Sequence, residues 1–98
     1  MSQPVSIAIG PAGEVYIGER GSNGVVRKVD TAGIISTFAG GGNIYPAIGP
    51  ATEIYLDFQS DLEVDAAGNV YVVAACHLVR IDTGGQATVI AGHLDASE

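Results

Sequence analysis

Short hydrophobic runs, rich in β-branched and aromatic residues, alternate with turn-forming residues along nearly the whole chain. Runs of this length, bounded by Gly, Pro, Asp or Asn, are typical of β-strands. The pattern therefore predicts an all-β chain with four strands in each half. The predicted strands are Val5–Ile9, Glu14–Gly18, Val25–Asp30 and Ile34–Ala39, then Ser60–Val64, Asn69–Ala74, His77–Asp82 and Ala87–Ala91.

Glycine-containing connections separate consecutive strands in each half. They are 11–13 and 31–33 in the first half, and 66–68 and 83–85 in the second. Glycine adopts the positive φ angles that tight hairpins need. Strands joined so closely must be antiparallel neighbours, so each half is predicted to form a four-stranded antiparallel meander.

The two halves are copies of one repeat. Gly13–Ile17 returns as Gly68–Val72 at an offset of 55, and Gly33–Gly40 returns as Gly85–Gly92 at an offset of 52. Self-similarity at such a period indicates a repeat architecture, and a repeated four-stranded meander is the unit of a β-propeller blade. Val70–Val73 has no polar alternation, which is typical of a strand covered on both faces by neighbouring layers.

This repeat predicts the organisation of the chain. We expect a first blade over residues 1–42, a connector over 43–58, a second blade over 59–92 and a short tail over 93–98. The connector exceeds the usual length of a loop. We expect a helical turn at Pro50–Tyr55 within it, with Leu56 or Phe58 docking the segment.

Several motifs resemble the NHL repeat over roughly residues 4–92. They are Asp65 with the following 66–72, the strand Val26–Asp30, and the closing Ser36–Gly40. The connector Gly49–Glu53 with Leu56 resembles the inter-blade segment of bacterial members. The sequence departs from the family pattern at Gly10, where relatives carry Asp, and at Asp61 and Glu63, where they mostly carry small residues.

The resemblance implies a six-bladed ring, which two blades cannot close. Two blades alone would leave both outer faces bare. Three copies restore six blades, and closed cyclic symmetry prevents endless head-to-tail growth. We therefore expect a homotrimer; a longer propeller of which this is one part, or a ring with another number of blades, are the alternatives.

Composition changes this picture only in part. Hydrophobic residues make up 47% of the 98-residue chain and charged residues 15%, against about 25% charged in typical soluble domains. Such an imbalance is expected when faces are buried against other subunits, although a monomer with an apolar surface would also show it. The net charge of −7 opposes binding to nucleic acids, which needs a basic stripe.

Membrane binding is not expected either, and the compartment stays open. The apolar run Val70–Cys76 is far shorter than the roughly 20 residues of a membrane helix. No N-terminal segment has the pattern of a signal peptide, so we expect a soluble protein. Cys76 is the single cysteine, which excludes an intrachain disulfide and a cysteine-based zinc cluster.

First strands line the channel of a propeller, so Ser6, Ala8, Asp61 and Glu63 are the candidate channel residues. Under threefold symmetry, three copies of each carboxylate would surround one axis and could attract Ca²⁺. The interpretation we favour is a wet channel wall that holds only water. No cofactor is predicted.

The connector offers a second candidate region, because Tyr45 and Tyr55 could form a rim for ligand or partner contacts. His77 begins a third strand, too far from the axis for three copies to share a zinc ion. The favoured function is a non-enzymatic binding scaffold for a protein or small molecule. The alternative is a metal-dependent lyase or hydrolase with a channel carboxylate site.

Overall fold

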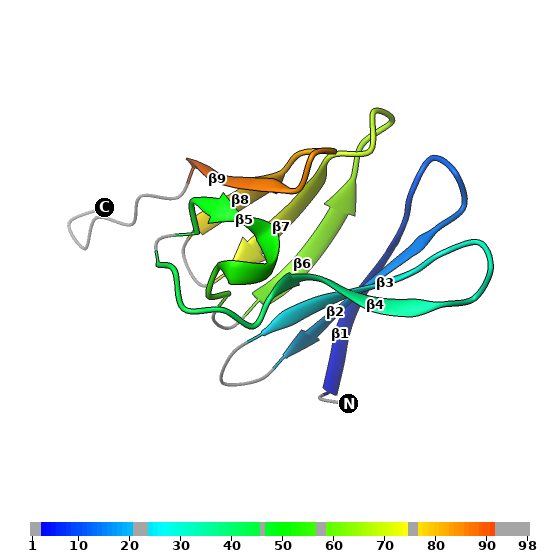
Figure 1. Cartoon of the computed structure of the whole chain (residues 1–98), viewed down its shortest axis with the longest axis horizontal. Coiled ribbons are helices and arrows are strands. Elements are labelled where there is room, and N and C mark those ends of the chain that lie inside the picture. Colours follow the sequence, from blue (N-terminus) through cyan, green and yellow to red (C-terminus); the bar gives the residue numbers. More distant parts are fainter. Residues whose placement is uncertain (1–2, 21–23, 46, 57–58, 75–76, 92–98) are drawn as a thin grey trace.

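The computed structural model describes residues 3–20, 24–45, 47–56, 59–74 and 77–91. They form an all-β structure of two antiparallel sheets (Figure 1). The first sheet has the order β1-β2-β3-β4, and the second has the order β5-β9-β8-β7-β6. The strands are β1 (Gln3–Ile9), β2 (Val15–Arg20), β3 (Val25–Val29), β4 (Ile35–Gly40), β5 (Gly49–Pro50), β6 (Gln59–Val64), β7 (Val70–Ala74), β8 (His77–Ile81) and β9 (Gln86–Ala91).

Every strand predicted from the hydrophobic pattern is present, with ends that differ by at most two residues. One feature differs from the prediction, because the second sheet has five strands rather than four. Gly49 and Pro50 of the connector pair with Ala87 and Gln86 of β9. A proline can join only the edge of a sheet, since it cannot donate a ladder hydrogen bond.

Three of the hairpin turns share one mechanism, in which an aspartate closes the turn. The Oδ1 atoms of Asp30, Asp65 and Asp82 each accept hydrogen bonds from the backbone N–H groups two and four residues later. A glycine with positive φ follows each aspartate by three residues. These aspartate side chains bind backbone N–H groups that would otherwise pair with a neighbouring strand, and so they end the strands at fixed positions.

Strand register defines two faces in the first sheet. The Tyr16 face carries Ser6, Ala8, Tyr16, Gly18, Val26 and Lys28, and the Ile17 face carries Ile7, Ile9, Val15, Ile17, Glu19, Arg27, Val29, Ile35 and Thr37.

The second sheet also has two faces, in the same register. The Val72 face carries Leu62, Val64, Val70, Val72, Val79, Ile81 and Ala87, and the Tyr71 face carries Asp61, Glu63, Tyr71, Val73, Leu78 and Arg80.

The core lies between the two sheets. Buried residues of the first sheet lie mainly on the Tyr16 face, and those of the second sheet lie on the Val72 face. The two faces therefore pack against each other, with β6 beside β1 and β2. Among the described residues, the outer faces of both sheets are largely uncovered. Of the cover predicted on both faces of Val70–Val73, the single chain supplies one side, since Val72 is buried and Val73 on the outer face is 36% exposed. Cover on the second side stays a prediction for the assembled propeller.

The connector crosses from one sheet to the other as a compact segment. A 3-10 helix, η1 (Ala51–Glu53), forms inside the predicted helical turn. The next residues are anchored by backbone hydrogen bonds from Gly42 N to Ile54 O and from Gly24 N to Leu56 O. Ile54 and Leu56 are completely buried, so the predicted docking by Leu56 is confirmed, whereas Phe58 lies outside the described residues.

Among the described residues, no helix has the length and apolar character that a membrane crossing requires.

Candidate functional site

The predicted channel residues lie on the two strands that meet between the sheets. Ser6 is on β1, and Asp61 and Glu63 are on β6. Their side chains point in different directions, since Ser6 lies on the inward Tyr16 face and the two carboxylates lie on the outward Tyr71 face. Both carboxylates are exposed. The single chain therefore does not bring these three residues together.

Ser6 and Asp61 have contrasting local environments. The Ser6 hydroxyl is buried and has no hydrogen-bond partner among the described residues. The Asp61 carboxylate accepts a hydrogen bond of 2.8 Å from the backbone N–H of Leu62. Within the described ranges, no group of three or more His, Cys, Asp or Glu side chains could hold a metal ion. A channel closes only in an assembled ring, so a place for these residues along one stays a prediction.

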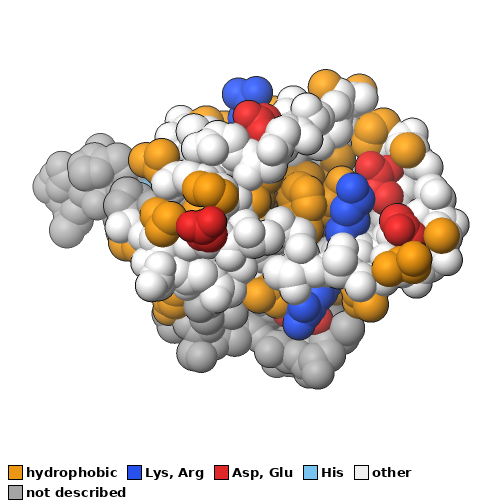
Figure 2. Space-filling view, viewed as in Figure 1, with side chains coloured by type: hydrophobic (Ala, Val, Ile, Leu, Met, Phe, Trp, Pro, Cys, Tyr) orange, Lys and Arg blue, Asp and Glu red, His pale blue; other side chains and the backbone are white. Residues whose placement is uncertain are grey.

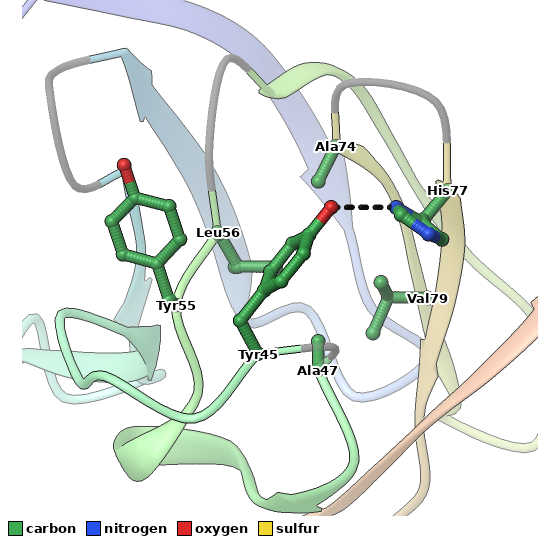
Figure 3. Close-up of a pocket in the computed structure, with 7 residues that line it drawn as sticks. All are labelled: Tyr45, Ala47, Tyr55, Leu56, Ala74, His77 and Val79. Carbon is green, nitrogen blue, oxygen red and sulfur yellow. Dashed lines mark hydrogen bonds between the residues drawn. The ribbon is translucent and has the colours of Figure 1, made fainter. Parts of the chain in front are cut away.

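The predicted rim residues Tyr45 and Tyr55 do come together. Their rings pack edge to face with centroids 6.2 Å apart, and the ring of His77 packs against Tyr45 at 5.6 Å (Figure 3). The Tyr45 hydroxyl and His77 Nδ1 are 3.4 Å apart. The half-buried His77 thus ties the start of β8 to the connector.

This aromatic cluster is packed rather than hollow. Ala47, Leu56, Ala74 and Val79 complete its walls, and the enclosed space has no room for a water molecule. Its geometry favours a structural role, in which the tyrosines hold the connector against the second sheet. Any contact with a ligand or partner would use the exposed edge of Tyr45, which is 52% accessible.

A cleft that the sequence analysis did not identify opens between the sheets at their turn ends. It has space of about 220 Å³, and its walls are formed by Pro11, Glu14, Tyr16, Lys28 and Phe38 of the first sheet and Ala67, Gly68 and Thr83 of the second. Figure 2 shows hydrophobic and basic side chains side by side in the hollow between the sheets. Sequence alone could not reveal the cleft, because its walls come from two repeats and meet only through packing.

Lys28 sets the electrostatic character of this cleft. Its ammonium lies 5.8 Å from the Tyr16 ring centroid and 5.9 Å from that of Phe38, while the two rings pack edge to face at 5.0 Å. Such cation–π contacts hold an ammonium beside aromatic faces and leave its N–H donors free for a ligand. With the Glu14 carboxylate on the same wall, the cleft can bind a small polar molecule. The described residues of its lining include no histidine or cysteine.

The equivalent turns of the two sheets, 10–14 and 65–69, each hold a carboxylate, but at different positions of the turn. In the second sheet, Asp65 Oδ2 accepts hydrogen bonds from the Tyr71 hydroxyl at 3.0 Å and from Asn69 Nδ2 at 3.1 Å. In the first sheet Gly10 stands where Asp65 does, and Glu14 stands where Asn69 does.

Glu14 takes over the task that Asp65 performs in the second sheet. Glu14 Oε1 accepts from the N–H of Ala12 at 2.9 Å, and Glu14 Oε2 lies 3.4 Å from the Tyr16 hydroxyl. A Cβ atom placed on Gly10 would overlap the Glu14 carboxyl group. The departure from the family pattern at Gly10 is therefore compensated in space by Glu14.

This exchange predicts a rescue. Gly10→Asp alone should lower the unfolding free energy by about 1–3 kcal/mol, because it forces two carboxylates into one site. Gly10→Asp with Glu14→Asn should recover most of that loss, because it recreates the Asp65–Asn69 arrangement. Denaturant unfolding of the wild type, both single variants and the double variant measures the coupling. Additive losses in the double variant would contradict the compensation.

Both turns perturb the acidity of their groups. The hydrogen bond from the Asn69 side chain, followed by that from its backbone, lowers the pKa of Asp65. The pKa of Glu14 is also lowered, chiefly by a hydrogen bond from its own backbone N–H. Burial raises the pKa of Tyr16, and the hydrogen bond to Asp65 raises the pKa of Tyr71.

These shifts predict stability losses at both ends of the pH scale. The lowered carboxyl pKa values contribute stability above the unfolded values near 4, which is lost as the pH falls through the folded values. The raised tyrosine pKa values contribute stability below about 10, which is lost as the pH rises further. The denaturation midpoint should therefore decline below about pH 4 and above about pH 10. The alkaline decline should be smaller in Tyr71→Phe, and an unchanged decline would exclude the Tyr71–Asp65 bond as a cause.

Comparisons with known proteins assign no family to this chain. No protein-family model matches the sequence, and no curated protein shows significant similarity to it.

Proposed function

We propose that this chain forms two blades of an NHL-type β-propeller and acts as a non-enzymatic binding scaffold, completed by further copies of itself. Each antiparallel sheet would be one blade. Three copies would give the six blades that the resemblance implies. The ring would present its turns and clefts to a protein or small-molecule ligand.

The apolar Ile17 face of the first sheet is the observation that carries this proposal. Aliphatic side chains from all four strands lie on it, and three of them are strongly exposed: Ile7 at 66%, Ile9 at 68% and Ile35 at 50%. The rest of this face is polar, since it carries the Arg27–Glu19 ion pair and Thr37. An exposed apolar patch bordered by polar residues is typical of an interaction surface. Stacking of another sheet would remove this face from water.

The clefts supply the binding capacity of the proposed scaffold. The cleft beside Lys28 lies at the turn ends of both sheets, so in a ring it would open at one rim. Its cationic, carboxylate and aromatic groups suit a small polar ligand better than a chemical step, which would require a nucleophile or general base aimed at the ligand.

The alternative, a metal-dependent lyase or hydrolase, would draw its ligands from Asp61 and Glu63. These carboxylates could meet only around the axis of an assembled ring. Metal analysis of the purified protein separates the two functions: a stoichiometric divalent ion retained after dialysis would favour the enzyme, and none would favour the scaffold.

The mass in solution tests the assembly. Light scattering on a sizing column should give three times the chain mass of 9.9 kDa for the wild type. Ile7→Glu should reduce this to the chain mass, because it places a charge in the face that must be buried.

Ile34→Glu is the matched control. Ile34 is 64% exposed and comes directly before Ile35, so its side chain points to the side of the sheet opposite the Ile17 face. The control should keep the mass of the wild type. A wild type that stays at the chain mass at micromolar concentration would overturn the proposed assembly.

A further inference from the structure

Corresponding positions of the two repeats differ systematically in burial. On the Ile17 face, Ile7 is 66% exposed and Ile35 is 50% exposed. Their counterparts on the Val72 face, Leu62 and Ala87, are 2% and 0% exposed. All four of these residues are aliphatic, so the difference in exposure comes from what covers them: the first sheet covers the Val72 face, and no described residue covers Ile7 and Ile35. The two faces differ elsewhere, because Arg27 and Thr37 stand where Val79 and Val89 do.

The other pair of faces shows the reverse difference. Tyr16 and Ala39 are buried in the first sheet, whereas their counterparts Tyr71 and Ala91 are half-buried and exposed. Phe38, which is half-buried, corresponds to Ile90, which is 47% exposed. The Tyr71 face is thus a second copy of the Tyr16 face, without the sheet that would cover it.

The packing inside the chain is therefore asymmetric. Within the chain, the Tyr16 face of the first sheet packs against the Val72 face of the second sheet. In the described part of the chain, the Ile17 face of the first sheet and the Tyr71 face of the second sheet remain largely uncovered. The uncovered Ile17 face corresponds to the Val72 face, and the uncovered Tyr71 face corresponds to the Tyr16 face. The two uncovered faces of a chain are therefore equivalent to the two faces that pack against each other inside it.

We propose, building on the assembly described above, that the Ile17 face of one copy binds the Tyr71 face of another. The contact repeats the internal sheet packing. It is a head-to-tail contact between different surfaces, and not a twofold contact between identical ones. Every copy then uses both faces, which is the condition for a closed ring.

This pairing also completes a second cleft at each junction between copies. Arg80, Tyr71 and Ile90 correspond to Lys28, Tyr16 and Phe38, the residues on one wall of the internal cleft. The opposite wall, formed internally by Gly68 and Thr83, would come from Gly13 and Thr31 of the partner copy. Arg80 would supply the cation, so this second cleft exists only in the assembly.

The two junctions differ at their inner edge. Asp61 and Glu63 stand on the Tyr71 face where Ser6 and Ala8 stand on the Tyr16 face. Burying carboxylates without partners is costly. The edge of the junction nearest the axis is therefore expected to stay hydrated, and contact is concentrated around Val73, Leu78 and Ile90.

Two variants, each blocked on one face, test the pairing. Ile7→Glu blocks the Ile17 face, and Val73→Glu blocks the Tyr71 face. Each variant alone should have the chain mass of 9.9 kDa. An equimolar mixture should give a complex of two chains and nothing larger, because one intact face of each kind remains and the two blocked faces repel each other.

Other outcomes overturn the proposal. If Val73→Glu alone keeps the mass of the wild type, the Ile17 faces bind each other, and if Ile7→Glu alone keeps it, the Tyr71 faces do. A mixture that stays at the chain mass while the wild type assembles would overturn the pairing alone. A monomeric wild type would overturn the proposed assembly itself. Circular dichroism checks that each variant folds, and Ile90→Glu on the same face replaces Val73→Glu if that variant does not.

Discussion

Alanine at Gly40 should destabilise the fold by about 3–5 kcal/mol, one of the largest losses expected for a single methyl group in this chain. Gly40 has φ of +83°, a conformation that residues with a side chain rarely adopt. An added Cβ would also overlap the carbonyl oxygen of Gly24. That carbonyl belongs to backbone, so it cannot move aside as a flexible side chain would.

The position of Gly40 in the sheet explains why its backbone lies so close to that of Gly24. Gly40 pairs with Val25 at the start of β3, just past a register shift between Val26 and Arg27. The neighbouring Gly24 is itself held, because its N–H donates a 2.7 Å hydrogen bond to Leu56 O. The strand end, the register shift and the connector therefore all converge on this contact.

Gly33→Ala is the matched control for Gly40→Ala. Gly33 has φ of +85°, and an added Cβ there would meet nothing within 4 Å. Its substitution should cost only the conformational strain, about 1–2 kcal/mol. Urea unfolding of the two variants separates backbone strain from steric overlap. Equal losses for both would show that the close approach to Gly24 contributes nothing.

Truncating Ile54 should cost about 2–5 kcal/mol, because this side chain is completely buried between the connector and the sheets. Ile54→Ala removes buried apolar contacts and leaves a cavity. The native stability of small domains is only about 5–15 kcal/mol, so the loss is a large fraction of the total. Thermal and denaturant unfolding should both show it.

Ile48 provides the control from the same connector. It is 53% exposed, so Ile48→Ala should change the unfolding free energy by less than about 0.5 kcal/mol. A similar small effect for Ile54→Ala would mean that the connector is not part of the folded core. It would also mean that the connector links the two sheets without contributing to their stability.

The strands were predictable because their signals are local. Alternating β-branched runs and Asp-x-x-Gly turns act over a few residues, and the internal repeat confirmed each assignment by supplying it twice. The fifth strand was missed because Gly49–Pro50 has no strand pattern of its own. It is extended only because the edge of β9 lies beside it.

The arrangement of the candidate site residues, in contrast to the strands, could be predicted only in part. Ser6 and Asp61 occupy equivalent positions of the two repeats, but within one chain the other sheet covers the Tyr16 face of Ser6 and leaves the Tyr71 face of Asp61 and Glu63 exposed. A shared channel wall stays a prediction for the assembled ring. Tyr45 and Tyr55 were correctly grouped, yet their packing against His77 depends on how the connector folds back. Gly10 was recognised as unusual, but only the hairpin geometry revealed Glu14 as its substitute.

Local sequence thus determined the all-β class, the strands and the repeat, because turn chemistry and side-chain alternation act between near neighbours. The tertiary structure alone decided which faces are buried, since equivalent aliphatic positions of the two repeats, such as Ile7 and Leu62, differ in exposure according to whether another sheet lies against them. Burial depends on partners distant along the chain, and no local pattern records whether a partner is present. For that reason the cleft beside Lys28 and the uncovered Ile17 and Tyr71 faces became apparent only in three dimensions.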